Sequence, residues 1–329
     1  FAAALPAHAW PTPPLWTLAL ALTGALVLAR PRGLPGRGAA LACVLPVLVW
    51  RPDRPDPGEV WVQVLDVGQG LAAVVRTTHH TLVYDTGAPL GPRLDGAQAA
   101  VLPALRAAGV RRVDVLVVSH ADADHAGGLH SLLDALAVAQ VWSGTPELLS
   151  GVPARACVAG QRWTFDGVAM SVLHPPPGAS GTANARSCVV RIQAGGGLLL
   201  PGDIGAAQER ALLAGGLITP AQVVVAPHHG SRGASSAPFV RALRPAQVVF
   251  SAGYRSRFGH PHPDVLRRYA AAGARCWCTP RDGALSLRAS TPGGTAGAGP
   301  GQGAWQVDAQ RTTAPRWWRR RGGETGCAC

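Results

Sequence analysis

The sequence S-H-A-D-A-D-H-A-G-G, residues 119–128, carries four metal-ligand side chains within six residues. It follows Val113–Val118, a short apolar run rich in β-branched residues that is typical of a buried strand. It precedes Leu129–Ala139, an apolar stretch that we expect to form a helix. The quoted residues are therefore expected to form a loop at the carboxyl end of a buried strand, where α/β folds generally place their ligand sites.

The ligand-type side chains of this loop are His120, Asp122, Asp124 and His125. Side chains alternate along an extended chain, so the first three can point the same way, and the turn brings His125 beside them. Imidazole and carboxylate together suit Zn²⁺, Mn²⁺ or Fe²⁺ rather than Ca²⁺, which prefers oxygen ligands. The alternative is a polar loop in which Asp124 caps the next helix. The density of ligand types favours the metal site.

The rest of the chain predicts two similar halves in which ligands follow strands. Helices are expected at 97–108 and 206–214, and strands at 60–65, 72–76, 81–85, 162–165, 168–173, 187–193, 197–200, 222–226 and 248–251. Asp203 follows one buried strand, and His228 and His229 follow the next. This order predicts two sheets whose strand ends deliver ligands to one site.

Several motifs resemble those of a known family. Residues 120–125 resemble the H-x-H-x-D-H signature of the metallo-β-lactamase superfamily, with Asp122 where the second His usually stands. The H-x-D-x-D-H-x-G-G form is similar to the C-terminal domain of ComEC/Rec2 DNA-uptake channel proteins, a resemblance that covers roughly residues 60–290. It departs at Leu71, where relatives often carry an acid. The other matching motifs are Asp66-Val-Gly-Gln-Gly70, Asp85-Thr-Gly87, Pro-Gly-Asp203, His-His-Gly-Ser231 and Gly-His260-Pro.

This resemblance implies the α/β fold of a metallo-β-lactamase αββα sandwich and a centre for one or two divalent ions, Zn²⁺ or Mn²⁺. The implied metal ligands are His120, Asp122, Asp124, His125, Asp203, His228 and His229. One ion would be held by His120, Asp122 and a third group, and the other by Asp124, His125 and one of His228 and His229; Asp203 would join the two ions. Only one of His228 and His229 is expected to bind metal, because adjacent side chains of an extended chain point apart.

Other residues are expected around this centre. Catalytic roles are predicted for Asp124, His229 and His260, and the last of these could contact a phosphate or protonate a leaving group. His174 is a candidate by position for the superfamily's third His ligand, or else a structural loop residue before three prolines. The residues expected to line the site or support its ligands are Asn184, Ser187, Ser231 and Asp85.

The composition favours an anionic partner. The formal net charge is +12, and all 30 basic residues are Arg, a skew typical of codon-composition bias rather than a functional choice. Such a positive balance favours nucleic acid or a lipid surface. Residues 291–329 are Gly/Pro/Ala-rich and then rich in Arg and Trp, so we expect a disordered tail; a nucleic-acid-binding tail is the alternative.

The seven cysteines give little support to a zinc ribbon. Cys276 with Cys278 and Cys327 with Cys329 form C-x-C pairs rather than C-x-x-C pairs. In an oxidising compartment, Cys157 with Cys188 is one possible disulfide.

Residues 1–50 predict one or two transmembrane helices. Leu15–Ala29 has no charged residue and, extended to Trp10, approaches the ~20 residues that span a bilayer. Ala39–Trp50 is shorter and contains Pro46. The Arg-rich loop between the runs is expected on the cytoplasmic side, which would put the rest of the chain on the outer, periplasmic face of the inner membrane.

The domain division follows from these segments. The chain starts with Phe1, so we expect it to be the C-terminal part of a longer protein. The expected parts are a transmembrane segment at 1–50, a Pro-rich linker at 51–58, a metallo-β-lactamase-like domain at 59–290 and a basic tail at 291–329.

The function implied by the resemblance is a metal-dependent phosphodiesterase, a nuclease that hydrolyses DNA during uptake in natural transformation. Its expected partners are single-stranded DNA from an incoming duplex, the membrane, other competence proteins and an N-terminal channel part of the same protein. The alternative of another class is a non-catalytic DNA-binding or gating domain. Hydrolysis of a different ester or amide is a third hypothesis.

Overall fold

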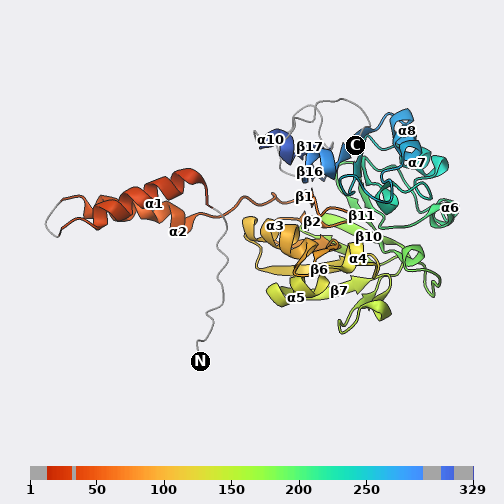
Figure 1. Ribbon diagram of the computed structural model, residues 1–329, viewed down its shortest axis with the longest axis horizontal. Helices are drawn as coiled ribbons and strands as arrows, with labels where there is room; N and C mark the ends of the chain where they lie inside the picture. The colour runs from red at the N-terminus through yellow and green to blue at the C-terminus, as the bar shows by residue number, and fades with distance from the viewer. Residues whose placement is uncertain (1–12, 32–34, 292–304, 315–328) are drawn as a thin grey trace. The chain divides into compact units, whose positions relative to one another are not determined.

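The computed structural model describes residues 13–31, 35–291, 305–314 and 329. The chain divides into two compact units: residues 1–54 with 103–111, and residues 55–102 with 112–329. In the first unit, α1 (Leu15–Leu28) and α2 (Arg37–Val49) form a helical hairpin (Figure 1). A Cβ atom at Gly24 would lie 2.5 Å from the Ala40 carbonyl oxygen, so glycine permits the close approach of the two helices.

These two helices expose an unusual amount of apolar side chain. The exposed residues are Leu15, Trp16, Leu18, Leu20, Leu22, Leu26, Leu41, Leu45, Leu48 and Val49. Within the described residues, no helix has both the length and the apolar character needed to cross a bilayer. The predicted transmembrane segments therefore stay predictions, and Trp10 and Arg32 lie outside the described residues.

The second unit is built on two large sheets. The eight-stranded sheet has the order β17-β16-β1-β2-β3-β6-β7-β8, and the seven-stranded sheet has the order β15-β14-β13-β12-β11-β10-β9. The strands of the first are β1 (Glu59–Val64), β2 (Ala73–Arg76), β3 (Thr81–Tyr84), β6 (Arg112–Val118), β7 (Ala137–Ser143), β8 (Arg155–Ala156), β16 (Leu285–Ser290) and β17 (Gln306–Ala309). The strands of the second are β9 (Arg162–Phe165), β10 (Val168–His174), β11 (Val189–Gln193), β12 (Leu198–Leu200), β13 (Val223–Val225), β14 (Gln247–Phe250) and β15 (Arg275–Cys278). A small hairpin, β4 (Pro89–Gly91) with β5 (Leu94–Asp95), stands apart from both.

The main core lies between the two sheets. Alternate residues of β1 and β10 point into it, because side chains of a strand alternate between its faces. The intervening residues of the seven-stranded sheet face outward: Leu199 and Val224 pack with Phe239 and Leu243 in a second core. This alternation is why both sheets are covered on each side.

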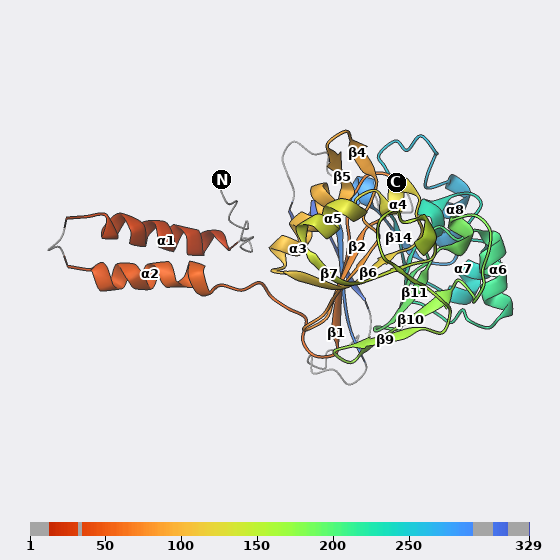
Figure 2. The same cartoon turned by 90° about the horizontal axis from the view of Figure 1, so that it is seen from below.

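Helices supply the outer layers. α6, α7 and α8 cover the seven-stranded sheet, whereas α5 packs against β7 and η1 of the other half (Figure 2). The resulting order of helix, sheet, sheet and helix is the αββα sandwich expected from the sequence. The helices are η1 (Ala97–Val101, a π-helix), α3 (Leu102–Ala107), α4 (Ala123–Ala126), α5 (Leu129–Ala135), α6 (Ala206–Ala214), α7 (Ala237–Leu243), α8 (Pro263–Ala271), α9 (Thr279–Asp282) and α10 (Gln310–Thr313), with short 3₁₀ turns η2 (Pro146–Leu148), η3 (Asn184–Arg186) and η4 (Pro227–Gly230).

The helix predicted for Leu129–Ala139 is wrong at its end. Helix α5 stops at Ala135, Leu136 takes an extended conformation (φ −142°), and β7 begins at Ala137. β7 pairs in parallel with β6, where Val138 lies opposite Val113. The β-branched residues of this stretch and the free edge of β6 favour a strand over further helical turns.

Residues 305–314 also depart from the expected disordered tail. β17 pairs with β16 (Figure 1). The buried Trp305 joins the main core, where its Nε1–H donates to the Ala194 carbonyl (3.1 Å). Arg311 forms an ion pair with Asp66 (3.1 Å). A composition-based prediction misses this segment because only a few of its residues pack into the core. The Arg/Trp run beyond residue 314 lies outside the described residues.

Between described residues, two disulfides join distant parts of this unit. Cys157 pairs with Cys188, the combination considered from the sequence, and Cys278 pairs with Cys329. The first connects the segment that follows β8 to the chain just before β11, and therefore links the two sheets.

Candidate metal centre

Ligand-type side chains gather where the parallel strands of both sheets end. β3 runs parallel to β6 in one sheet, and β12 runs parallel to β13 in the other. One ligand atom from each of four residues lies within 4.8 Å of the others. These four, here called the metal cluster, are Asp124, His125, Asp203 and His229.

Asp124 and His125 lie on a helical turn, not on the extended chain assumed for the loop. Asp122 still has an extended backbone (φ −64°, ψ 148°), but α4 starts at Ala123. The turn therefore carries Asp124 and His125 into the cluster and leaves His120 at the strand end. The helix that follows the loop, α5, has Gly128 at its N-cap and no side-chain capping hydrogen bond, which weighs against the capping alternative.

His125 is oriented by a buried carboxylate. Its Nδ1 lies 2.7 Å from Asp85, which also accepts hydrogen bonds from the backbone N–H (2.6 Å) and hydroxyl (2.9 Å) of Ser119. Because an ionised carboxylate only accepts, the Nδ1 of His125 carries a proton. Its Nε2 faces Asp203, 3.1 Å away. This nitrogen can therefore carry either a proton or a metal ion.

His229 is oriented in the same way by a backbone carbonyl. Its Nδ1–H donates to the Ser251 carbonyl (2.8 Å), so its Nε2 faces the cluster. This Nε2 lies 3.2 Å from Asp124, 3.5 Å from Asp203 and 3.2 Å from the Nε2 of His125. Two imidazole nitrogens and two carboxylates that converge in this way, each imidazole fixed from behind, are the donor set of a divalent cation such as Zn²⁺ or Mn²⁺.

The charges within the cluster support this assignment. Burial raises the pKa of Asp124, but the hydrogen bond from His229 and the nearby imidazoles outweigh it and lower the pKa to about 2. The pKa of Asp203 is held well below its usual range in the same way. Burial lowers the pKa of His125, whereas Asp203 and Asp85 raise it well above its ordinary value. A metal ion that binds here must therefore displace a proton from His125.

A neighbouring position is only partly supplied with ligands. The rings of His120 and His125 are 4.3 Å apart, and the Nε2 of His120 lies 3.4 Å from Asp122 without forming a hydrogen bond. The side chain of Asp122 is 48% exposed. Ser187 lies on the other side of the His120 ring: its hydroxyl is 3.4 Å from Nδ1 and accepts a hydrogen bond from the backbone N–H of Asp203 (3.1 Å). Within the described residues, no third ligand-type side chain joins His120 and Asp122 in a metal-binding group. This pair is called the second position below.

The loop after β1 closes over the cluster. A Cβ at Gly70 (φ 137°) would collide with the backbone oxygen of Asp124, which accepts a hydrogen bond from Leu71 (3.1 Å). The Gly70 carbonyl in turn accepts a hydrogen bond from the Ser251 hydroxyl (2.7 Å). The Asp66–Gly70 motif therefore holds Asp124 through its backbone and has glycine because no side chain fits there.

His228 and His260 lie beside the cluster but are not part of it. The Nε2 of His228 is 3.6 Å from Asp203, and its side chain is one-third exposed. Both His228 (φ 51°) and His229 (φ 55°) take left-handed conformations, so the extended geometry assumed for them is wrong; the structure nevertheless brings only His229 into the cluster. The ring of His260 lies 6.3 Å from that of His229, and burial together with the positive charge of His229 and His228 lowers its pKa to about 4.

Two further residues expected at the site, Asn184 and Ser231, contribute to it through the loops that they shape. Asn184 belongs to η3, where its backbone carbonyl accepts a hydrogen bond from Ser187 (3.1 Å). Ser231 ends η4, and its hydroxyl accepts a hydrogen bond from Gly233 (3.4 Å). Both residues therefore shape the loops that carry Ser187 and His229.

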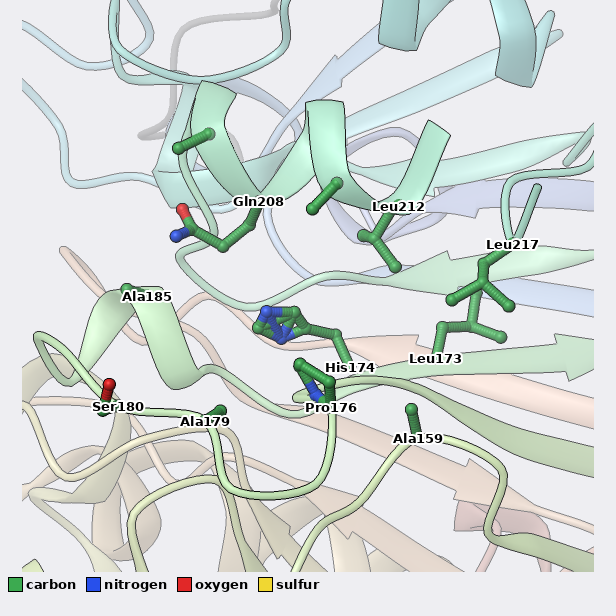
Figure 3. Close-up of a pocket in the computed structure, with 12 residues that line it drawn as sticks. Ala159, Leu173, His174, Pro176, Ala179, Ser180, Ala185, Gln208, Leu212 and Leu217 are labelled. Atoms are coloured by element: carbon green, nitrogen blue, oxygen red, sulfur yellow. The ribbon is translucent and has the colours of Figure 1, made fainter. Parts of the chain in front are cut away.

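His174 is brought to a different place. It lines a cavity of about 380 Å³ between the end of β10 and α6, whose walls include Pro176, Gln208 and Leu212 (Figure 3). Its Nδ1 is buried and has no hydrogen-bond partner in the part of the chain that the structure describes, and burial lowers its pKa to about 4. His174 is not a member of the metal cluster, so of the two roles considered for it the structure favours the loop residue over the third His ligand.

Sequence reasoning assigned no role to three supporting residues. Ser119 contacts Asp85 and His125. The Thr86 hydroxyl donates to the carbonyl of His125 (2.9 Å) and accepts a hydrogen bond from the Gly128 N–H (3.2 Å). Ser251 acts through its backbone carbonyl, which no side-chain motif can reveal. Ser119 and Thr86 had a signal, because both stand in the motifs that carry the expected ligands and Asp85.

Comparisons with known proteins agree with this geometry. A family profile described as the metallo-beta-lactamase superfamily matches residues 65–253. Competence protein ComA of Neisseria gonorrhoeae is 39% identical over 277 residues, which cover 83% of this chain and 39% of that protein. Uncharacterized protein YcaI of Escherichia coli is 30% identical over 292 residues, 88% of this chain and 36% of that protein. Recombination protein 2 of Haemophilus influenzae is 29% identical over 234 residues, 70% of this chain and 29% of that protein. The chain thus spans less than half the length of each of these relatives.

Proposed function

Because the chain belongs to the metallo-β-lactamase superfamily and, by its relatives, to the ComEC/Rec2 family, we propose that it is the metal-dependent nuclease part of a membrane DNA-uptake protein. The proposed reaction is hydrolysis of phosphodiester bonds in one DNA strand while the other enters the cell. The observation that carries the proposal is the metal cluster, in which His125 and His229 are both fixed from behind and face two carboxylates.

In this proposal Asp124, His125, Asp203 and His229 hold one divalent ion, Zn²⁺ or Mn²⁺. The bound ion would lower the pKa of a water molecule and offset the negative charge of the phosphate. Asp85 keeps His125 in the tautomer that can bind metal. His120 and Asp122 would hold a second ion only weakly, because Asp122 is half-exposed and no third ligand-type side chain joins the pair within the described residues.

His228 and His260 are suited to contact substrate. Both lie beside the cluster and are partly exposed, and burial lowers the pKa of each. Because the pKa of His260 is about 4, its ring is neutral near pH 7. A neutral imidazole can donate an N–H to a phosphate oxygen but is a poor source of a proton for a leaving group. Of the two roles predicted for His260, phosphate contact is therefore favoured.

The proposal includes a membrane location. The leucines exposed on α1 and α2 and the absence of charge from Leu15 to Ala29 support burial of this hairpin in a lipid or protein environment. We propose that the protein sits in the inner membrane with the sandwich on the periplasmic face. Its partners would be incoming DNA, other competence proteins and a channel part of the same protein. The catalytic domain would comprise residues 59–290 together with 305–314, after the linker at 51–58.

The test uses the whole chain purified in detergent. We expect close to one metal ion per chain and metal-dependent cleavage of end-labelled DNA with Mn²⁺ or Zn²⁺. Asp124→Ala should abolish both, whereas Asp134→Ala, which removes an exposed carboxylate on α5, should leave both unchanged. Undiminished metal-dependent cleavage by the Asp124→Ala chain would contradict the assignment of the nuclease to this metal cluster.

A non-catalytic DNA-binding or gating domain is the second candidate. The incomplete second position and Leu71, which replaces an acid of the family motif, favour it. DNA binding that survives in a chain with bound metal but without any cleavage would support this candidate over the nuclease.

A further inference from the structure

An exposed loop of alternating aromatic and basic residues borders the metal cluster. Residues 254–260, Y-R-S-R-F-G-H, follow β14 and are here called the aromatic–arginine loop. Tyr254 is 74% exposed and Phe258 is 54% exposed, although large apolar side chains of a folded domain usually pack inside. Arg255 and Arg257 are exposed as well. Within the described residues, neither arginine forms an ion pair, so both charges are available to a partner.

Each arginine of the loop lies against an aromatic ring. The guanidinium of Arg255 is 5.4 Å from the centre of the Tyr254 ring, and that of Arg257 is 4.8 Å from the centre of the Phe258 ring. These contacts hold the charges beside the rings. A surface of this kind offers flat apolar faces and positive charge at the same place, which is what a chain of bases and phosphates requires.

The loop is anchored to the part of the chain that closes the cluster. The side-chain oxygen of Gln69 accepts hydrogen bonds from the Gly253 backbone (3.2 Å) and the Ser256 hydroxyl (2.8 Å). The Ser256 hydroxyl also accepts a hydrogen bond from the Phe258 backbone (3.3 Å). Gln69 directly precedes Gly70, which packs on Asp124. The loop is therefore fixed relative to the cluster, and less conformational freedom is lost when a ligand binds.

A row of rings leads from the loop into the cluster. The ring of Phe258 lies 5.8 Å from that of His260 at an angle of 29°, and His260 lies 6.3 Å from His229 at an angle of 24°. Exposure falls along this row, from the exposed Phe258 to the buried cluster residue His229. A strand that stacks on Phe258 would therefore extend its backbone toward the ionised carboxylates and the metal they are proposed to hold.

We propose that the aromatic–arginine loop is a binding platform for single-stranded DNA, with bases stacked on Tyr254 and Phe258 and phosphates paired with Arg255 and Arg257. Bases in a duplex are stacked on one another, so the platform selects unpaired nucleotides and delivers them to the cluster. The identification of the polymer as DNA rests on the proposed function. The stacking itself does not require hydrolysis.

The experiment measures binding without cleavage. The full chain carrying Asp124→Ala, in EDTA, is titrated into a fluorescent oligothymidylate and followed by anisotropy. Tyr254→Ala with Phe258→Ala should weaken binding by at least about tenfold, and replacement of both residues by Trp should restore it. Arg255→Ala with Arg257→Ala should lower the slope of log Kd against log salt by about 1 to 2. The matched control, Arg210→Ala with Arg241→Ala, removes two exposed arginines from α6 and α7 and should change affinity much less.

Several outcomes would overturn the platform. One is an unchanged affinity of the Tyr254→Ala/Phe258→Ala chain for the oligonucleotide; another is an equal loss in the control pair. Loss of binding to anionic phospholipid vesicles with unchanged DNA affinity would mean that the loop contacts a lipid surface instead. If the native chain cleaves no DNA but the loop variants lose affinity as expected, the nuclease fails and the platform stands. If cleavage is confirmed and the loop variants bind DNA normally, the platform fails and the nuclease stands.

Discussion

The metal cluster and the second position lie side by side, yet the chain supports them very differently. In the cluster, the two imidazoles are each held at Nδ1, one by Asp85 and the other by the Ser251 carbonyl. In the second position, the Nδ1 of His120 contacts the hydroxyls of Ser119 and Ser187, and its Nε2 has no hydrogen-bond partner among the described residues. The two positions therefore differ in the groups that fix the tautomers and rotamers of their imidazoles, a difference that is expected to govern metal affinity.

The largest expected difference between the positions is in metal content. Asp203→Ala should reduce bound metal from about one ion per chain to below one-tenth, because it removes a central carboxylate and leaves His125 and His229 facing each other. His120→Ala should leave metal content near one. Elemental analysis after dialysis measures both. Equal losses in the two variants would show that the positions form one indivisible centre.

A smaller effect on metal binding is expected when Asp85, which contacts the Nδ1 of His125, is replaced. Asp85→Asn should weaken metal binding about 10- to 100-fold, because the amide NH₂ can donate to the Nδ1 of His125 and so favour the tautomer that carries its proton on Nε2. Competition with a chromogenic chelator gives the affinity. Asp114→Asn, at a carboxylate that accepts a hydrogen bond from the Thr81 backbone, is the matched control and should stay within about twofold. If the Asp85→Asn chain binds metal with wild-type affinity, Asp85 does not support metal binding through His125.

His174 allows the same comparison for a histidine with no supporting carboxylate. Burial lowers its pKa to about 4, so the unfolded chain takes up a proton at this residue at a higher pH than the folded chain does. Its contribution to the free energy of unfolding is therefore complete above about pH 6.5 and falls as the pH drops toward 4, by on the order of 2 kcal/mol. Denaturant unfolding of His174→Leu should show less loss over this range than the native chain. His130→Leu, at an exposed histidine, should lose as much unfolding free energy over this range as the native chain does.

The smallest effect is expected at Ser187. Ser187→Ala removes a hydroxyl beside His120 and the acceptor for the Asp203 backbone, but no cluster ligand atom. We expect metal affinity to change by less than about fivefold, since backbone hydrogen bonds of this kind contribute about 1 kcal/mol. Isothermal titration with Zn²⁺ provides the measurement. Loss of all metal in this variant would make the hydroxyl a ligand of the cluster.

The sequence predicted most of the sandwich because its signals are local. The β-branched strand before residue 119 and the alternation at Val60–Val64 each identify a strand without knowledge of its neighbours. β7 was missed because Ala137–Ser143 continues the apolar run of a helix, and only pairing with β6 makes it a strand. β17 was missed because its composition is that of a tail, and Trp305 becomes a core residue only when the main core exists to receive it.

The ligand-type residues and most of their grouping were predictable. Asp124, His125 and one of His228 and His229 were expected to hold one ion with Asp203 beside them, and the structure brings Asp124, His125, Asp203 and His229 together. Which of His228 and His229 enters the cluster depends on two left-handed residues, a conformation that the side chains do not signal. The two roles considered for His174 could not be separated, because only the tertiary structure shows that β10 carries it to the α6 side of its sheet. These choices depend on tertiary geometry, which local patterns do not encode.

The order of strands in the eight-stranded sheet has a consequence for how the protein is made. β1, the first strand of the sandwich, pairs with β16, so that Glu59 lies opposite Ser290, and β17 extends the same edge. A ribosome delivers these partners at opposite ends of the domain's synthesis, and contacts between distant segments form slowly. The edge of the sheet formed by β1, β16 and β17 cannot be completed until almost the whole domain has been made. We therefore expect folding to be post-translational, with β1 available to chaperones or to other chains while it waits for its partner.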